Sequence, residues 1–330
     1  MQAGVLVGRP LAFAGRIGAV RPCEVDSCVL SCHTALRVNF STVSWTMWRL
    51  ALLENRCDVH THTVASRHAY STVEENVRAA SERGVDLLGV TDHFSCMTSV
   101  GVQTDGTGAD IRDYQSFLDT VVWPREWHGV TLLRGAEADI VDVQGTLFGH
   151  GIPMPNKIPG DPYPEPLDLE TRILSDTDYA IASVHIKTFC NLATPAQNAT
   201  MYVHALEHPK VLILGHIGRL GIDFELDPVI EAARDLGKLI EINNSTVIAY
   251  PAAQERCRRI AQRCAELGCS ISLGTDAHIS YTVGRFDQTL EMLEEIDFPQ
   301  ELIATRSRES FLDAMRAARI EPARRNPLVL

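Results

Sequence analysis

Residues 57–63 have the sequence Cys-Asp-Val-His-Thr-His-Thr, a short apolar segment that runs directly into two histidines. Short apolar segments of this kind recur along the chain, and amphipathic helical segments separate them. The predicted strands are residues 57–59, 87–91, 131–136, 179–184, 211–215, 239–242 and 270–274. Such alternation is typical of parallel strands joined by crossover helices. Seven strand–helix units predict a closed or nearly closed α/β barrel.

Helix ends support this division of the chain. Each expected helix start carries a capping residue, and glycines follow the expected helix ends. The starts are the Ser71/Glu74 capping box, Thr194-Pro195 and Asp227-Pro228, and the ends are Gly84, Gly237 and Gly268. Amphipathic helices are expected over residues 252–267 and 286–296. The proline-rich residues 153–166 are predicted to form a surface loop between the third and fourth units.

Composition limits the class of protein. The chain has 330 residues, 45% of them hydrophobic, and contains no apolar run of about 20 residues, which excludes a membrane-spanning helix. A net charge of −12 argues against nucleic-acid binding, which needs a basic surface. The nine cysteines are scattered singly, which favours reduced thiols and a cytoplasmic protein over a disulfide framework.

Residues 1–46 differ from the rest of the chain. They carry four arginines against two acids, a charge of +2, so the remainder carries −14. We expect a poorly ordered extension, with Met47 as an alternative start and residues 47–330 as the catalytic domain. A targeting peptide, or a small metal site at Cys23, Cys28, Cys32 and His33, is the alternative.

Histidines and acids follow the predicted strands. In a parallel barrel the carboxyl ends of the strands converge on one mouth, where active sites form. Nine side chains able to bind metal are expected there: His60, His62, His68, His93, Glu137, His185, His216, Asp276 and His278. Imidazoles with a few carboxylates suit zinc, iron or manganese. A catalytic zinc uses three protein ligands, so nine predict two or three ions, with Glu137 as the expected bridge.

Four motifs in this order resemble those of the PHP (polymerase and histidinol phosphatase) family. They are residues 58–63 (DVHTHT), 91–93 (TDH), 135–137 (GAE) and 274–278 (GTDAH). Within the family, residues 64–72, 241–246 and 273–278 are similar to bacterial YcdX-type phosphatases. The likeness spans about residues 57–322.

The resemblance implies a distorted seven-stranded TIM-like (β/α) barrel with a trinuclear centre, usually of zinc, with manganese or iron possible. One ion would take His60, His62, Glu137 and Asp276; a second His68, His93 and His278; and the third Glu137, His185 and His216. Catalytic roles would fall to Glu137, Asp276 and His278. The resemblance also implies a homo-oligomer, a trimer in the YcdX-type proteins.

Two features depart from the family. Where the family usually has proline after the histidine of the fifth strand, this chain has His216-Ile217-Gly218-Arg219. The loop of residues 94–110 lacks the expected histidines, and we expect it at the rim of the pocket. Lys187 and Arg219 lie just past ligand positions and are expected either to bind phosphate or to be solvated. Asn243 and Asn244 are expected to orient a water or ligand, or to satisfy loop backbone.

These features predict metal-assisted hydrolysis of a small phosphomonoester, without membrane or nucleic-acid partners. One alternative is a PHP-type exonuclease or nucleotide phosphodiesterase, which would need a basic approach surface. A carbon–nitrogen bond hydrolase would use a different carboxylate or lysine pattern. A regulatory metal-binding module would bind the ions without turnover.

Overall fold

The computed structural model describes residues 53–321 and 323–325, and the expected extension lies outside them. Seven parallel strands follow one another in the order β1-β2-β5-β6-β7-β8-β9, as expected for the barrel. Their bounds are β1 Cys57–Thr61, β2 Leu87–Val90, β5 Val130–Asp139, β6 Tyr179–Ser183, β7 Val211–Leu214, β8 Leu239–Asn243 and β9 Ile271–Gly274. Every residue of these strands is buried, because side chains fill the interior on one face and helices cover the other.

Two additional short strands pair with β5. The strand β3 (His93–Phe94) runs parallel to the carboxyl end of β5 and places His93 opposite Glu137. The strand β4 (Glu126–Trp127) is antiparallel to the start of β5. Neither was among the seven predicted strands, because a two-residue strand leaves no periodic pattern in the sequence.

The barrel closes where the ends of β1 and β9 meet. The amide of His62 donates to the carbonyl of Ala277 at 2.9 Å, and the amide of Asp276 donates to the carbonyl of His60 at 2.8 Å. A parallel bridge between Thr61 and Ala277 lies between these bonds. Closure therefore occurs at the carboxyl ends of the strands and brings the first and last histidine motifs together.

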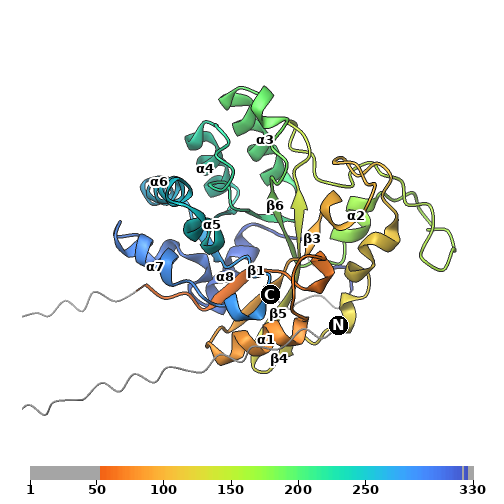
Figure 1. The fold of residues 1–330 in the computed structure, drawn as a ribbon, viewed down its shortest axis with the longest axis horizontal. Helices are drawn as coiled ribbons and strands as arrows, with labels where there is room; N and C mark the ends of the chain where they lie inside the picture. Colours follow the sequence, from red (N-terminus) through yellow and green to blue (C-terminus); the bar gives the residue numbers. More distant parts are fainter. Residues whose placement is uncertain (1–52, 322, 326–330) are drawn as a thin grey trace, which may run out of the picture. The chain divides into compact units, whose positions relative to one another are not determined.

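Helices surround the strands, and α3, α4, α6 and α7 follow one another around the outside of the sheet (Figure 1). Their bounds are α1 Val73–Glu82, α2 Leu169–Leu174, α3 Pro195–Glu207, α4 Leu226–Asp235, α5 Asn244–Ala249, α6 Pro251–Leu267, α7 Asp287–Glu294 and α8 Arg308–Ala317. None of the helices in the described part of the chain is both long enough and apolar enough to span a bilayer. The cysteines described, at positions 57, 96, 190, 257, 264 and 269, are free thiols.

Two of the predicted helix caps are wrong, because the side chains are used elsewhere. The hydroxyl of Ser71 accepts from the amide of Ser280, and the capping box of α1 is formed one residue later, by Thr72 and Glu75. Asp227 lies inside α4, which begins at Leu226 after Glu225, and its carboxylate accepts from Arg263 at 2.7 Å. A tertiary partner outcompeted the local cap in both cases.

The other helix ends are confirmed. Thr194 caps α3 with Pro195 in its first turn, and Gly268 ends α6 in the left-handed conformation. Gly84 and Gly237 adopt positive φ two residues after the last residues of α1 and α4. Residues 153–166 lie in the mostly exposed segment between β5 and α2, confirming the predicted loop.

Candidate metal centre

The nine side chains predicted as metal ligands lie at, or just beyond, the carboxyl ends of the strands. We call this set the mouth cluster. Its members are His60 and His62 from β1, His68 from the following loop, His93 from β3, Glu137 from β5, His185 after β6, His216 after β7, and Asp276 and His278 after β9. Strands far apart in the sequence therefore deliver them to one end of the barrel.

Glu137 lies at the centre of the mouth cluster and is fully buried. Five histidine rings place a nitrogen within 3.5 Å of its carboxylate: His60, His185 and His216 at Oε1, and His62 and His93 at Oε2. The two shortest distances are 2.8 Å, from His216 Nε2 to Oε1 and from His93 Nδ1 to Oε2. One carboxylate thus presents both oxygens to rings from different strands, as a bridging ligand would.

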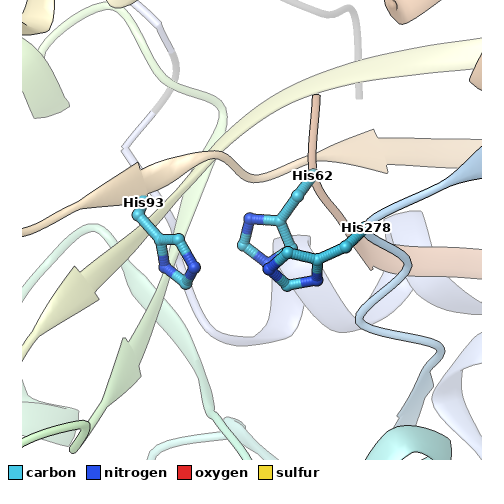
Figure 2. A group of neighbouring side chains, drawn as sticks. All are labelled: His62, His93 and His278. Atoms are coloured by element: carbon cyan, nitrogen blue, oxygen red, sulfur yellow. The ribbon is translucent and has the colours of Figure 1, made fainter. Parts of the chain in front are cut away.

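The remaining members lie around this centre. His62 Nε2 is 3.1 Å from Asp276 Oδ1, and His68 Nε2 is 3.0 Å from His278 Nε2. Figure 2 shows the ring of His93 facing those of His62 and His278, with the His62 centroid 4.3 Å from each of the other two. The structure therefore brings all nine predicted residues into one connected cluster.

Several buried polar atoms of the mouth cluster have no hydrogen-bond partner among the described residues. These atoms are His60 Nε2, His62 Nε2, His93 Nδ1 and Glu137 Oε2. His93 Nδ1 and Glu137 Oε2 approach to 2.8 Å without the geometry of a hydrogen bond. An unsatisfied buried polar atom costs about 1–3 kcal/mol. Lone pairs left unpaired together, on imidazole and carboxylate, fit a site for divalent transition metals.

Three sets of side chains have ligand atoms close enough to share an ion. They are His60, His62 and Asp276; His62, His93 and His278; and His93, Glu137 and His185. The first lies within the first ligand set implied by the resemblance. The other two differ from the implied sets by one histidine each. In the second, His62 replaces His68, and in the third, His93 replaces His216. Shared members between the sets indicate adjoining ion positions.

Supporting carboxylates, which the sequence analysis did not identify, orient the rings. Glu241 on β8 bonds His60 Nδ1 at 2.8 Å through one oxygen and accepts from the amide of His216 at 2.8 Å through the other. Asp139 on β5 bonds His185 Nδ1 at 2.7 Å. A carboxylate on one ring nitrogen fixes the tautomer that leaves the other nitrogen free for a metal.

A second support lies beneath His62. The buried carboxylate of Asp92 accepts from the amide of Thr63 at 2.7 Å and from the hydroxyl of Ser66 at 2.6 Å. The Ser66 oxygen in turn lies 3.0 Å from His62 Nδ1 and accepts from the amide of His93. Asp92 therefore positions two histidines through one serine.

Charges within the cluster set the protonation states. Burial would raise the pKa of Glu137, but His60, His185 and His93 hold it well below its usual range. Burial, together with the charge of Arg219, lowers the pKa of His216 to about 4, so that ring is neutral. Burial also disfavours charge on His185, yet Glu137 and Asp139 raise its pKa to about 9. Metal binding would therefore displace a proton from His185.

The backbone is strained at two members of the mouth cluster. His216 has φ of 32° and Asp276 has φ of 54°, in the left-handed region that non-glycine residues rarely adopt. Gly274 precedes the second of these, and a Cβ there would lie 2.3 Å from Glu241 Oε1 and 2.6 Å from His60 Cβ. Strain of this kind, together with an obligatory glycine, is typical of functional sites.

The two residues predicted to contact substrate, Arg219 and Lys187, have different hydrogen-bond partners. Arg219 donates to Asp276 Oδ2 and, at 3.1 Å each, to Asn243 Oδ1 and Thr246 Oγ1. The Lys187 ammonium donates to the carbonyl of Leu220 at 2.7 Å, which uses one of its three donors. Arg219 thus holds Asp276, whereas the other two donors of Lys187 have no partner within residues 53–321 and 323–325.

Asn243 and Asn244 both accept hydrogen bonds from backbone amides, in line with the second of the two roles expected for them. Asn243 caps α5 by accepting from the amide of Thr246 at 3.0 Å. Asn244 accepts from the amide and hydroxyl of Thr289.

The family model described as "PHP domain" matches residues 58–248. A curated relative from Caldanaerobacter subterraneus, named a probable phosphatase, is 36% identical over 76% of this chain and 87% of its own. A probable phosphatase from Clostridium acetobutylicum is 33% identical over 79% of this chain and 94% of its own. A solved histidinol phosphate phosphatase from Lactococcus lactis, complexed with zinc, histidinol and phosphate, matches 74% of this chain and 95% of that chain, with 16% identity and a TM-score of 0.44.

Proposed function

The chain belongs to the PHP domain family, and from that premise we propose that it is a metal-dependent phosphatase of small phosphomonoesters. One observation carries the proposal. Five histidine nitrogens surround the fully buried carboxylate of Glu137, and several of these buried atoms lack hydrogen-bond partners. The relatives named probable phosphatases support the choice of phosphate esters as substrates.

We propose that the mouth cluster holds three divalent ions, zinc foremost, with manganese or iron as alternatives. Its members as ligands are His60, His62, His68, His93, Glu137, His185, His216, Asp276 and His278. All are nitrogen or carboxylate donors, a set that zinc, manganese and iron accept and that magnesium and calcium rarely use. Bound ions would polarise a phosphoryl oxygen and supply a nucleophile from water at neutral pH.

The chain's own residues would orient this chemistry. Glu241 and Asp139 hold the rings of His60 and His185, so their free nitrogens face the interior of the cluster. Arg219 holds Asp276 through its guanidinium, which favours the ionised carboxylate. We assign Arg219 the role of positioning Asp276. It could contact the phosphate directly only after its bond to Asp276 breaks.

Lys187 is the better candidate for a direct contact with the phosphate. It lies two residues beyond His185, is only half-buried, and uses one ammonium donor on the carbonyl of Leu220. The donors that remain can reach an anion at the mouth of the barrel. A lysine in this position would bind the phosphate as a point charge and would not select among leaving alcohols.

A screen with defined metals tests the proposal. Apoprotein would be reloaded with zinc, manganese or iron, and assayed against sugar phosphates, nucleotides and bisphosphates, with metal content measured on the same sample. We expect phosphate release that rises with metal content and is largest for monoesters. Full metal loading without hydrolysis of any phosphoester would instead indicate a binding module, and preferential cleavage of DNA ends would indicate a nuclease.

A further inference from the structure

A second cavity lies outside the mouth cluster, between the loop that joins β7 to α4 and the helix α6. Figure 1 shows α4 and α6 as neighbours on the outer side of the barrel. The cavity has a volume of about 220 Å³. Residues 217–218 and 221–224 of the loop, Leu226 at the start of α4 and the middle of α6 line it, and no member of the mouth cluster does. Its volume is below the range of about 300–1,000 Å³ typical of drug-sized ligands, so it suits a small molecule.

The floor of this cavity is apolar. Ile217, Ile222 and Ile260 are each at most 9% exposed, and Phe224 and Leu226 are half-buried beside them. An apolar floor of this size would bury the hydrocarbon part of a ligand, which contributes about 25 cal/mol for each Å² removed from water.

The wall is basic, because Arg256 and Arg259 both line the cavity. Arg256 donates to the carbonyls of Gly218 and Arg219 and to the hydroxyl of Tyr250, none of which carries a negative charge. The exposed guanidinium of Arg259 has neither a hydrogen bond nor an ion pair within residues 53–321 and 323–325. Among the described residues, the exposed Asp223 is the one carboxylate that lines the cavity.

Neighbouring arginines on the same helix are neutralised. Arg258 pairs with Glu295 and Glu255, and Arg263 pairs with Asp227 and Glu266. The chain is acidic overall, with a net charge of −12, so carboxylates are plentiful. Arg256 and Arg259 have no carboxylate partner in the described part of the chain, and both line this apolar cavity. They therefore mark a place prepared for an anion from outside the chain.

We propose that this cavity binds a small organic anion with an apolar body, either a carboxylate or a phosphate. The apolar body would lie on Ile217, Ile222 and Ile260. The anionic group would accept hydrogen bonds from Arg259 and from the donors that Arg256 keeps free. Planar, bidentate recognition by guanidinium groups suits both anions. The proposal does not depend on the phosphatase activity.

Isothermal titration of the metal-loaded protein with benzoate tests this site. Benzyl alcohol serves as the neutral analogue, and phenylphosphonate distinguishes phosphate-like from carboxylate ligands. We expect saturable binding of at least one of the two anions, and binding of benzyl alcohol at least about tenfold weaker, because one charge-assisted bond is worth about 1.5–3 kcal/mol.

Matched variants separate this cavity from the mouth cluster, which can also bind anions. Arg259→Ala should weaken binding about tenfold or more, whereas Arg258→Ala removes the same charge from the same helix and should leave binding nearly unchanged. Leu226→Trp should block the cavity and abolish binding. Arg256 is unsuitable for this test, because it also holds the loop that carries Arg219.

Three outcomes would overturn the proposal. The first is that neither anion binds saturably at concentrations up to about 10 mM. The second is equal binding by the wild-type protein and the Arg259→Ala variant. The third is equally tight binding of benzyl alcohol and benzoate.

Discussion

The mouth cluster and a second group of histidines, which surrounds Glu170, differ in how their nitrogens are used. In this Glu170 cluster (Glu170, His150 and His208), His150 Nδ1 hydrogen-bonds one carboxylate oxygen at 3.0 Å, and His208 Nε2 lies 2.9 Å from the other. His208 Nδ1 also accepts from the amide of Lys210. At the mouth, several ring nitrogens around Glu137 have no such partner.

Both clusters pair a buried glutamate with histidines, so residue types alone do not distinguish them. The difference lies in the lone pairs. The Glu170 cluster does not form a set of ligand atoms close enough to share an ion, and every such set in the described residues lies at the mouth. A metal site is therefore indicated by unpaired nitrogen and oxygen atoms that lie close together, and not merely by histidines near an acidic residue.

The largest expected effect comes from Glu137→Gln. An amide keeps the shape but cannot bridge ions, and its NH2 group would face the ring nitrogens. We expect phosphatase activity to fall by at least about a thousandfold, corresponding to about 4 kcal/mol, with loss of bound metal. Steady-state kinetics and metal analysis of the same sample measure both quantities.

The matched control for this change is Glu170→Gln. It makes the same substitution in the Glu170 cluster and should leave metal content and activity unchanged, while lowering the free energy of unfolding by about 1–2 kcal/mol. Full activity in the Glu137 variant would remove that residue from the centre. Equal loss of metal in both variants would erase the distinction between the clusters.

Metal removal should affect the mouth cluster only. Chelation would leave buried polar atoms unpaired and would withdraw the stabilisation by bound ions, about 3–4 kcal/mol at metal concentrations of 100 to 1,000 times Kd. Denaturant unfolding with and without chelator measures the difference. We expect the wild-type protein and Glu170→Gln to lose this amount and Glu137→Gln to lose much less. A similar loss in all three would contradict binding at the mouth.

Glu241→Gln should have an intermediate effect. The carboxylate bonds the ring of His60 and the amide of His216, so its loss would loosen two members of the mouth cluster without removing either. Loss of such a supporting group typically costs about 10–100-fold in metal affinity or activity. Excess metal should restore much of the activity, which would separate positioning from participation in catalysis. Unchanged metal affinity would show that His60 needs no orientation.

The smallest effect concerns the framework of the Glu170 cluster, where Lys238 donates to the carbonyls of Leu206 and His208. Burial lowers the pKa of Lys238 to about 8 in the folded protein. The unfolded chain keeps its proton to about pH 10.4, so the free energy of unfolding should rise between about pH 8 and pH 10.4. We expect about 1–2 kcal/mol after allowance for solvent screening.

Chemical denaturation of the wild-type protein and Lys238→Met at several pH values tests this expectation. The variant lacks the titrating group, so the difference between the two free energies should change in this pH window and nowhere near neutral pH. A difference independent of pH would show that Lys238 keeps its ordinary pKa. Metal content should be the same in both proteins.

The strands and most of the mouth cluster could be predicted because these side chains lie at or near the ends of recognisable apolar segments. Glu241 could not be assigned a role from the sequence. Its role depends on contact with the His60 ring, which only the structure shows. Asp139 could have been identified from the sequence. It lies two residues after Glu137, and alternate residues of a strand point to the same face of the sheet.

Local rules failed where a tertiary partner intervened. Ser71 and Asp227 both have good capping chemistry, but Ser280 and Arg263 occupy them. The basic cavity behind the β7–α4 loop was also beyond prediction, because unpaired arginines are recognisable only when every neighbour has been placed. Pairing, rather than residue type, is what the sequence leaves undetermined.

Anomalous diffraction at the zinc edge, from crystals of zinc-loaded protein, tests the assignment of the mouth cluster most directly. We predict strong anomalous density between the Glu137 carboxylate and the surrounding histidine rings, and none at Glu170. Density at Glu170, or none at the mouth in protein that hydrolyses phosphomonoesters, would contradict the assignment.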